Sequence, residues 1–281
     1  MAHSHFEQLK KLLLLLDDPR NDIFVHVDKK SRNLDLDLFV DVTQQSSLTF
    51  IPRKKVTWGA YSQIRCELDL LETATKSFHD YYHLLSGVDL PIKSQDQIHS
   101  FFEINKGYEF LEFQDGAMEK KVFLDRIQVY HFLQDFVGNR KSNTRIFNIE
   151  RVLLKLQQVL NIDRLKNSDL KFKKGANWFS ITDDFAKYTI SQIPQIRRLY
   201  KYTKCADEIF MHTLAWNSRF KESIITDSKR YIDWKRGNPY NFRLEDFDSI
   251  MNSPCFWARK FSEDDDPEII QKIFDTFNVV R

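Results

Sequence analysis

The amino-acid sequence predicts a single α/β domain in which a mostly parallel central sheet is flanked by helices. Short apolar runs alternate with amphipathic stretches in the first half of the chain, a pattern typical of a parallel sheet covered by helices. The 281 residues suffice for one large domain, and no Gly-, Ser- or Pro-rich linker divides them. With 42% hydrophobic and 29% charged residues, the composition is that of a globular protein rather than a disordered chain.

The spacing of the apolar residues distinguishes helices from strands. Ile64, Leu68 and Leu71 form the stripe of an amphipathic helix, whereas residues 23–27 are a short β-branched run suited to a buried parallel strand. In chain order we expect a helix over 6–16, strands over 23–27 and 48–51, a helix over 61–75, a strand over 81–84, a short helix ending near 101, an extended segment over 110–113, a strand over 178–181, and helices over 183–193, over 207–216 and from 267 onward.

The segment 120–174 is expected to be a helical insertion on the acceptor side of the domain. It is rich in Phe, Lys and Arg, and its apolar residues recur at helical spacing from Ile146 to Val159. No internal repeat accompanies it.

The start of the chain lacks the strand that usually opens a doubly wound fold. It begins directly at Ala2, His3 and Ser4, which resemble a first strand-to-helix turn, so either the fold starts late or a longer protein carries an upstream strand. The apolar run 12–16 is far shorter than the ~20 residues of a membrane span. We interpret it as the end of an amphipathic helix and not as a signal peptide.

Charge and cysteine content exclude several classes of protein. A net charge of +2 is too small to indicate a nucleic-acid partner. Three widely spaced cysteines (Cys66, Cys205 and Cys255) argue against a disulfide framework and for a reducing compartment, and without a CxxC motif no structural zinc site is expected.

Asp207 and Glu208 stand at the start of the helix predicted over 207–216. Asp207 occupies the N-cap position, and Glu208 then lies in the first turn, where the helix dipole favours a charged carboxylate. A general base must be unprotonated and held in place, so Glu208 is the candidate base. The alternatives are a carboxylate that only caps the helix, or half of a metal site with His212, four residues later on the same face.

Three further places could bind a nucleotide. His26 and Asp28 end the first predicted strand, and ligands of open α/β sheets bind at the carboxyl ends of strands. Trp58, before Gly59, could stack on a base or a sugar. Arg259 and Lys260 follow an apolar run, and a diphosphate would compensate their charge.

Acidic clusters are interpreted as solvated surface. Asp35 and Asp37 form an Asp-x-Asp sequence of the kind that holds a divalent metal in many nucleotide-sugar enzymes, but they stand in a polar stretch rather than at a buried strand end. The run 264–266 precedes the last helix, which opens at Pro267.

Together these segments resemble the Core-2/I-branching enzyme family, which contains β-1,6-N-acetylglucosaminyltransferases and peptide O-xylosyltransferases. The order and spacing of seven short segments carry the resemblance from end to end of the chain. They are IFVHVDKKS at 23–31, VTWGAYS at 56–62, YYHLLSGVDLPIKS at 81–94, GANWFS at 175–180, ADEIFMHT at 206–213, YIDW at 231–234 and CFWARKF at 255–261.

The resemblance implies a GT-A-like fold and an inverting, metal-independent glycosyltransferase with a UDP-sugar donor and no other cofactor. It implies that Glu208 deprotonates the acceptor hydroxyl and that Arg259 and Lys260 neutralise the leaving diphosphate. It also implies that Asp28 and Trp58 contact the uridine end of the donor. Glu112 and Trp234 would contact the acceptor sugar, and a second arginine, either Arg236 or Arg243, would bind the diphosphate.

The chain also departs from animal members, which carry Golgi anchors and paired cysteines. We therefore expect a bacterial-type, cytoplasmic member whose acceptor is a saccharide or glycolipid precursor at the inner membrane face, with peripheral membrane contact. The donor sugar, N-acetylglucosamine or xylose, is left open. The rival hypotheses are a glycoside hydrolase, which needs two carboxylates about 5–10 Å apart, and a non-catalytic sugar-binding protein.

Overall fold

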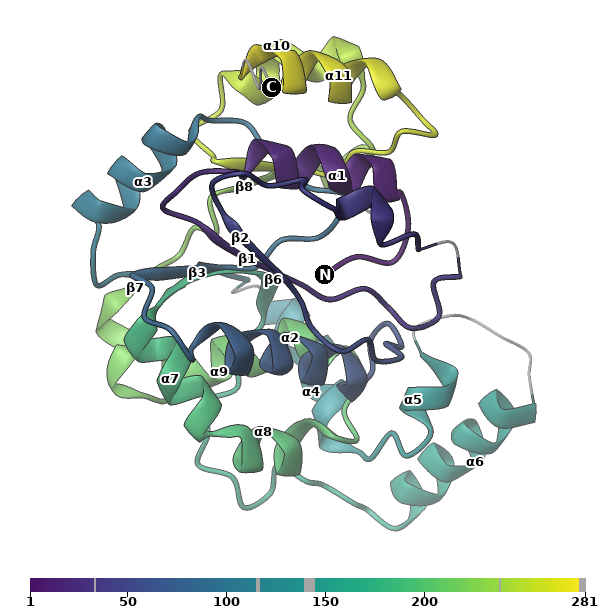
Figure 1. The fold of residues 1–281 in the computed structure, drawn as a ribbon. Coiled ribbons are helices and arrows are strands. Elements are labelled where there is room, and N and C mark those ends of the chain that lie inside the picture. The colour runs from purple at the N-terminus through teal and green to yellow at the C-terminus, as the bar shows by residue number, and fades with distance from the viewer. Residues whose placement is uncertain (33, 115–116, 139–144, 238, 278–281) are drawn as a thin grey trace. The chain divides into compact units, whose positions relative to one another are not determined.

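The computed structural model describes residues 1–32, 34–114, 117–138, 145–237 and 239–277, and Figure 1 shows their helices and strands. The α/β class is confirmed, because strands and helices alternate along the chain. Two compact units share the residues. The first unit comprises Met1–Lys54, Leu84–Lys106 and Lys229–Arg281, and the second comprises Lys55–His83 and Gly107–Ser228. Whether the chain behaves as one domain stays a prediction.

The first unit contains two small sheets and the helices that cover them. The strands are β1 (Asp22–Val25), β2 (Ser47–Phe50), β4 (Leu90–Pro91), β8 (Arg230–Ile232) and β9 (Trp257–Arg259). β1 pairs with β2 in parallel, and β9 lies between β4 and β8. The helices are α1 (Phe6–Leu15), η1 (Asp37–Phe39), α3 (Gln95–Ile104), η4 (Leu244–Asp246), α10 (Phe247–Met251) and α11 (Pro267–Thr276).

Helix α1 forms the centre of the hydrophobic core of the first unit. It contacts β4 and α11, and Figure 1 shows α11 above α1. Leu9, Leu12 and Leu13 are spaced three to four residues apart, so they fall on one face and are buried. The expected start of α11 is confirmed, since Pro267 is at its first turn and the Asp266 carboxylate accepts hydrogen bonds from two backbone N–H groups of that turn.

The second unit is built on a four-stranded sheet in the order β3–β6–β5–β7. These strands are β3 (Tyr81–His83), β6 (Gly175–Thr182), β5 (Glu109–Phe113) and β7 (Ile224–Ile225). The helices outside the 120–174 segment are α2 (Tyr61–Ala74), α7 (Asp183–Ser191), α8 (Ile193–Tyr200), η2 (Ala206–Glu208), α9 (Phe210–Trp216) and η3 (Arg219–Ser223). α7 contacts α2 as well as β3 and β6.

The segment 120–174 is helical in its first part, as expected. It contains most of α4 (Ala117–Gln128), then α5 (Gln134–Val137) and α6 (Arg145–Val159). Residues 139–144 of the predicted insertion lie outside the described residues. Only Glu150 and Gln157 of α6 are buried, so the apolar stripe of this helix does not face the interior of the unit.

The strand directions correct the expectation of a mostly parallel sheet. Of the pairings between the named strands, β1–β2, β5–β7 and β8–β9 are parallel, while β3–β6, β4–β9 and β5–β6 are antiparallel. Alternating strands and helices specify parallel neighbours only when consecutive strands are also neighbours in the sheet. β6 instead lies between β3 and β5, which precede it by many residues.

Three smaller findings bear on the sequence predictions. Ala2 forms an isolated parallel bridge with Val27, and whether a strand precedes it stays a prediction. Cys66, Cys205 and Cys255 are all free thiols, as expected. Among the described residues, no helix combines the length and the apolar character that a bilayer crossing requires.

Candidate functional site

Glu208 does not stand where the sequence predicted, at the start of a long helix. It ends the short 3-10 helix η2, and α9 begins only at Phe210. Asp207 is not an N-cap, because Cys205 precedes η2 and Ile209 precedes α9, neither with a side-chain cap. The argument from the helix dipole therefore does not apply to Glu208. Local periodicity cannot reveal a change from 3-10 to α-helix within one turn.

Two cations hold Glu208 instead. Arg126 Nη1, on α4, donates a hydrogen bond of 2.8 Å to Glu208 Oε2, and Lys174 Nζ lies 3.6 Å from the same oxygen. The Glu208 side chain remains 36% exposed, so a ligand can reach it. Charge-assisted contacts of this length restrict a carboxylate to one orientation. The site thus presents a partly exposed carboxylate in a defined position.

Two buried carboxyl groups lie behind Glu208. Gln63 Nε2 donates a hydrogen bond of 2.9 Å to Asp207 Oδ2, and Asn177 Nδ2 donates one of 2.8 Å to Glu67 Oε1. Burial, with the charge of Glu208, raises the pKa of Asp207 to about 7, and burial beside Asp207 raises the pKa of Glu67 well above its usual value. Burial thus favours the neutral form of both carboxyl groups beside the exposed Glu208 carboxylate.

The Trp58–Gly59 turn is joined to η2 by hydrogen bonds. Gly59 has a φ of 74°, which glycine adopts without strain. Its carbonyl accepts from Cys205 N at 2.8 Å, and its N–H donates to the amide of Gln63, which also binds Asp207. Trp58 itself is 63% exposed. The second unit therefore places an exposed indole on the same hydrogen-bonded framework as Glu208.

His212 is structural rather than a partner of Glu208. It is buried, its Nε2 lies 3.1 Å from the backbone carbonyl of Glu112, and burial lowers its pKa to about 4. The expectation that it shares a helix face with Glu208 is wrong, since η2 ends before α9 begins. The predicted acceptor residue Glu112 is half-buried, and its Oε2 accepts a hydrogen bond of 2.8 Å from Ser228 Oγ.

In the first unit, β1 ends at Val25, so His26 and Asp28 lie directly after the strand and not within its predicted end. His26 is buried, and its Nε2 accepts a hydrogen bond of 3.0 Å from Lys54 N. Asp28 Oδ1 accepts one of 2.9 Å from Lys30 N, and Lys30 Nζ lies 3.6 Å from Oδ2. Arg53 donates to the carbonyls of Asp28 and Ser31, which fixes the loop after the strand.

Arg259 and the loop after β3 meet in the same unit. Arg259 Nε lies 3.5 Å from Asp89 Oδ1, and Asp89 is fully buried. Ser86 donates to both Asp89 oxygens, from its backbone N at 2.8 Å and its hydroxyl at 2.7 Å. Burial lowers the pKa of Arg259, an effect that Asp89 partly offsets. This cation is therefore held at a strand end with limited exposure.

Gly87 lies close to the backbone at the start of the chain. Its N–H donates to Met1 O at 2.9 Å, and a Cβ at this position would lie 3.0 Å from the Cβ of Ala2. Ala2 in turn hydrogen-bonds His26 and Asp28 through its backbone. Residues 1–2 thus join the loop after β1 to the loop that holds Asp89.

The two candidate diphosphate arginines differ in their partners. Arg236 is bound by two carboxylates, with Nε 2.6 Å from Asp233 Oδ2 and Nη1 2.8 Å from Asp246 Oδ1. Arg243 is exposed, and its Nη1 donates a hydrogen bond of 3.3 Å to the carbonyl of Asp265.

The other predicted residues lie on accessible segments. Trp234 is 52% exposed on the loop after β8, and Lys260 is half-buried directly after β9. Asp35 and Asp37 are exposed, as expected. Within the described ranges, no three His, Cys, Asp or Glu side chains gather into a group that could hold a metal.

A family model named Core-2/I-Branching enzyme matches residues 1–250. The chain belongs to this family. Its relatives include xylosyltransferase 2 from Canis lupus familiaris and from Rattus norvegicus, each 25% identical over 94% of this chain, and xylosyltransferase 1 from Homo sapiens, 24% identical over 95%. The chain spans 31% of the first two relatives and 28% of the third, so it corresponds to about a third of their length.

Family membership directs attention to residues that the sequence argument missed. Arg126 and Lys174 hold Glu208, Asp89 pairs with Arg259, and Arg230 is buried with its guanidinium 4.4 Å from the Trp257 ring. Asp89 lies within the segment 81–94 and Lys174 directly precedes the segment 175–180, so their position was a usable signal. Arg126 is 82 residues from Glu208, and nothing local to it indicates the contact.

Proposed function

We propose that this chain is an inverting glycosyltransferase that moves a sugar from a UDP-sugar to a hydroxyl group of a saccharide or glycolipid acceptor, with Glu208 as the general base. One observation carries the proposal. In this member of the Core-2/I-Branching enzyme family, the Glu208 carboxylate is partly exposed and is held by Arg126 and Lys174. A general base must be held in position and must be ionised, and the two cations beside Glu208 favour both conditions.

In the proposed reaction the acceptor oxygen attacks the anomeric carbon while the bond from that carbon to the diphosphate breaks. Glu208 takes the proton of the acceptor hydroxyl. Both cations contact Oε2, so we assign Oε1 as the atom that receives the proton. The electron pair of the broken bond leaves with UDP, whose additional negative charge needs compensation.

Arg259 and Lys260 are the proposed source of that compensation. Arg259 projects from the end of β9 with 13% of its side chain exposed, and a poorly hydrated guanidinium binds phosphate oxygens strongly. Arg243 is the better candidate for the second diphosphate arginine, because a ligand at Arg236 would have to displace Asp233 and Asp246. We propose that these side chains act without a bound metal.

The donor class remains part of the proposal. The relatives named above are xylosyltransferases, which makes UDP-xylose and UDP-N-acetylglucosamine the first two donors to test. Asp28 and Trp58 are proposed to bind the uridine end of the donor, with His26 supporting the loop of Asp28. Glu112 and Trp234 are proposed to contact the acceptor sugar.

The experiment is a thermal-shift screen with UDP-sugars followed by turnover assays. A donor at 100 times its Kd should add about 2.7 kcal/mol of stability. Glu208→Gln should lose transfer by at least about a hundredfold, as expected for a general base, and keep UDP affinity. Glu222→Gln, at a side chain that is 87% exposed, is the matched control and should change neither.

Each outcome decides the proposal. Near-full kcat in Glu208→Gln would reject this base, and strict dependence on added manganese after EDTA treatment would reject the metal-free reaction. Release of sugar without a nucleotide donor would indicate a hydrolase. UDP binding with no turnover on any acceptor or on water would indicate a non-catalytic protein.

A further inference from the structure

Helix α6 carries its apolar residues on the outside of the second unit. Val152 is 64% exposed, Leu156 52% and Val159 77%, although all three are aliphatic. We call the exposed aliphatic side chains of this helix and the residue that follows it the α6 face: Ile146, Ile149, Val152, Leu156, Val159 and Leu160. Figure 1 shows α6 at the edge of the second unit. Exposed apolar patches of this kind mark interaction sites in soluble proteins.

Hydrogen bonds on the flank of the stripe away from Arg151 and Lys155 hold α6 in this orientation. Glu150 Oε2 accepts from Leu133 N at 3.1 Å. Gln157 accepts from Tyr130 N at 2.7 Å and donates to Tyr130 O at 2.9 Å. Rotating the helix to bury the α6 face would break these bonds and leave buried polar groups unsatisfied. The outward direction of the apolar side chains is therefore built into the packing of the helix.

The charges of α6 indicate what the face contacts. Arg145, Arg151 and Lys155 are exposed, whereas the only acidic residue of the helix, Glu150, is buried. At 100° per residue, Arg151 and Lys155 fall on one flank of the apolar stripe. Between residues 120 and 174 the sequence has 13 Lys and Arg against 5 Asp and Glu.

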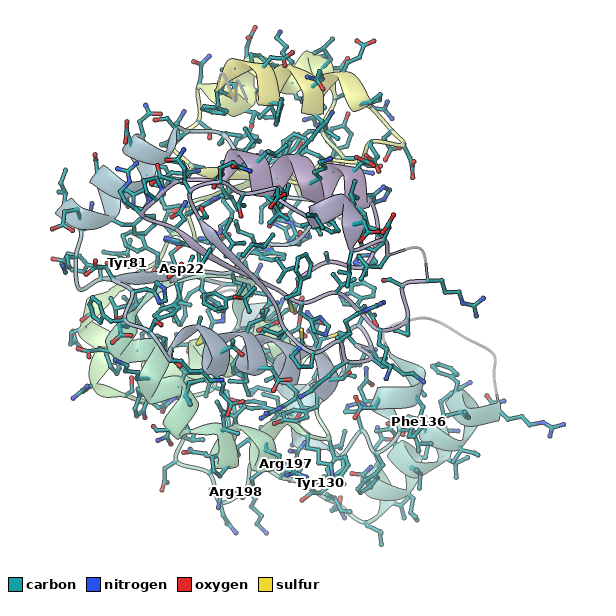
Figure 2. All side chains as sticks on the ribbon, viewed as in Figure 1. Asp22, Tyr81, Tyr130, Phe136, Arg197 and Arg198 are labelled. Atoms are coloured by element: carbon teal, nitrogen blue, oxygen red, sulfur yellow. The ribbon has the colours of Figure 1, made fainter. Side chains whose placement is uncertain are left out.

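We propose that the α6 face binds the surface of an anionic membrane, with the aliphatic side chains in the acyl boundary and Arg151 and Lys155 at the phosphate level. An apolar stripe flanked by exposed cations is the pattern of helices that lie in the membrane interface. Phe136 is 74% exposed at the end of α5, which contacts α6, and extends the apolar surface beside the helix (Figure 2).

A second copy of the chain fits the same face less well. Two α6 helices packed through this stripe would bring Arg151 and Lys155 of each copy together, and α6 offers no exposed carboxylate to pair with them. Like charges at close range oppose such a contact, whereas anionic lipids compensate them. The proposal concerns a surface and does not depend on the reaction proposed above.

Co-sedimentation with vesicles tests the proposal. The full chain should bind phosphatidylcholine vesicles with about 30 mol% phosphatidylglycerol, bind pure phosphatidylcholine much more weakly, and lose binding as salt rises. The uncharged double substitution Val152→Ser with Leu156→Gln should weaken binding by about tenfold or more. Arg151→Gln with Lys155→Gln should weaken it by about fivefold per residue, on the anionic vesicles only.

The matched control makes the same changes at exposed aliphatic residues outside the face. Val40→Ser with Ile104→Gln replaces side chains that are 66% and 83% exposed, and vesicle binding should stay at the wild-type level. Absence of wild-type binding, or equal binding by the face variant, would overturn the proposal. So would concentration-dependent self-association of the wild type that Val152→Ser with Leu156→Gln abolishes, because that result would identify a second copy as the occupant.

Discussion

Replacing Asp207 by Asn should stabilise the protein at neutral and alkaline pH while leaving its stability at acidic pH unchanged. Asp207 is only 5% exposed, and burial raises its pKa from 3.8 to about 7. An unfolded chain releases this proton near pH 3.8, whereas the folded protein keeps it until about pH 7. The free energy of unfolding therefore falls as pH rises between these values, and asparagine removes this dependence.

The magnitude follows from the pKa values. A pKa that rises from 3.8 to about 7 corresponds to about 4 kcal/mol at pH 8. The advantage of Asp207→Asn should be near zero at pH 4, grow by about 1.4 kcal/mol per pH unit, and level off above pH 7. The asparagine carbonyl can still accept the hydrogen bond that Gln63 donates to Asp207.

Urea unfolding followed by tryptophan fluorescence, at pH values from 5 to 8, measures this difference. The control is Asp169→Asn at an exposed aspartate, which should change the free energy of unfolding little. An Asp207→Asn effect that is equally large at every pH, or that destabilises most at pH 8, would refute the assignment of a protonated buried carboxyl group behind Glu208.

Two further predictions concern arginines, one in the second unit and two in the first. Arg126→Ala removes the 2.8 Å contact with Glu208 and should lower kcat by about tenfold, because the base is then less firmly positioned. The affinity for UDP, measured by calorimetry, should stay unchanged. A loss of UDP affinity at constant kcat would contradict the positioning role. Arg243→Ala should weaken UDP binding by about tenfold, as expected for one lost charge-assisted contact. Arg236→Ala should lower the free energy of unfolding more than the affinity for UDP, because it leaves Asp233 and Asp246 without this partner. The reverse pattern in the two variants would assign the diphosphate contact to Arg236.

Apolar spacing located several of the regular elements within a few residues, but α8, α10 and the short strands β7, β8 and β9 were not predicted. α1, α2, β1 and β2 each coincide closely with a predicted range, because their periodicity is a property of consecutive residues. The resemblance to the Core-2/I-Branching enzyme family also needed no structure, and the family model that matches residues 1–250 confirms the family. The candidate site residues themselves remain predictions, although their positions are now known.

Local sequence could not predict the directions of the strands, the contacts between residues far apart in the chain, or which side chains are buried. The antiparallel pairing of β6 depends on which strands become its neighbours, and Glu208 is held by Arg126 across 82 residues of chain. The failed N-cap assignment of Asp207 has the same cause, since its burial comes from Gln63 and the rest of the unit rather than from its own helix.

The sequence by itself determined the α/β class, the order of the elements and the family of this protein, because these follow from residue types and their spacing. Only the tertiary structure decided that Glu208 is held by two cations, that Asp207 is buried beside it, and that the α6 face is turned to solvent. The physical reason is clearest at α6. An apolar stripe has the same period whether it faces a core or solvent, and the hydrogen bonds of Glu150 and Gln157 to distant backbone groups hold this stripe outward.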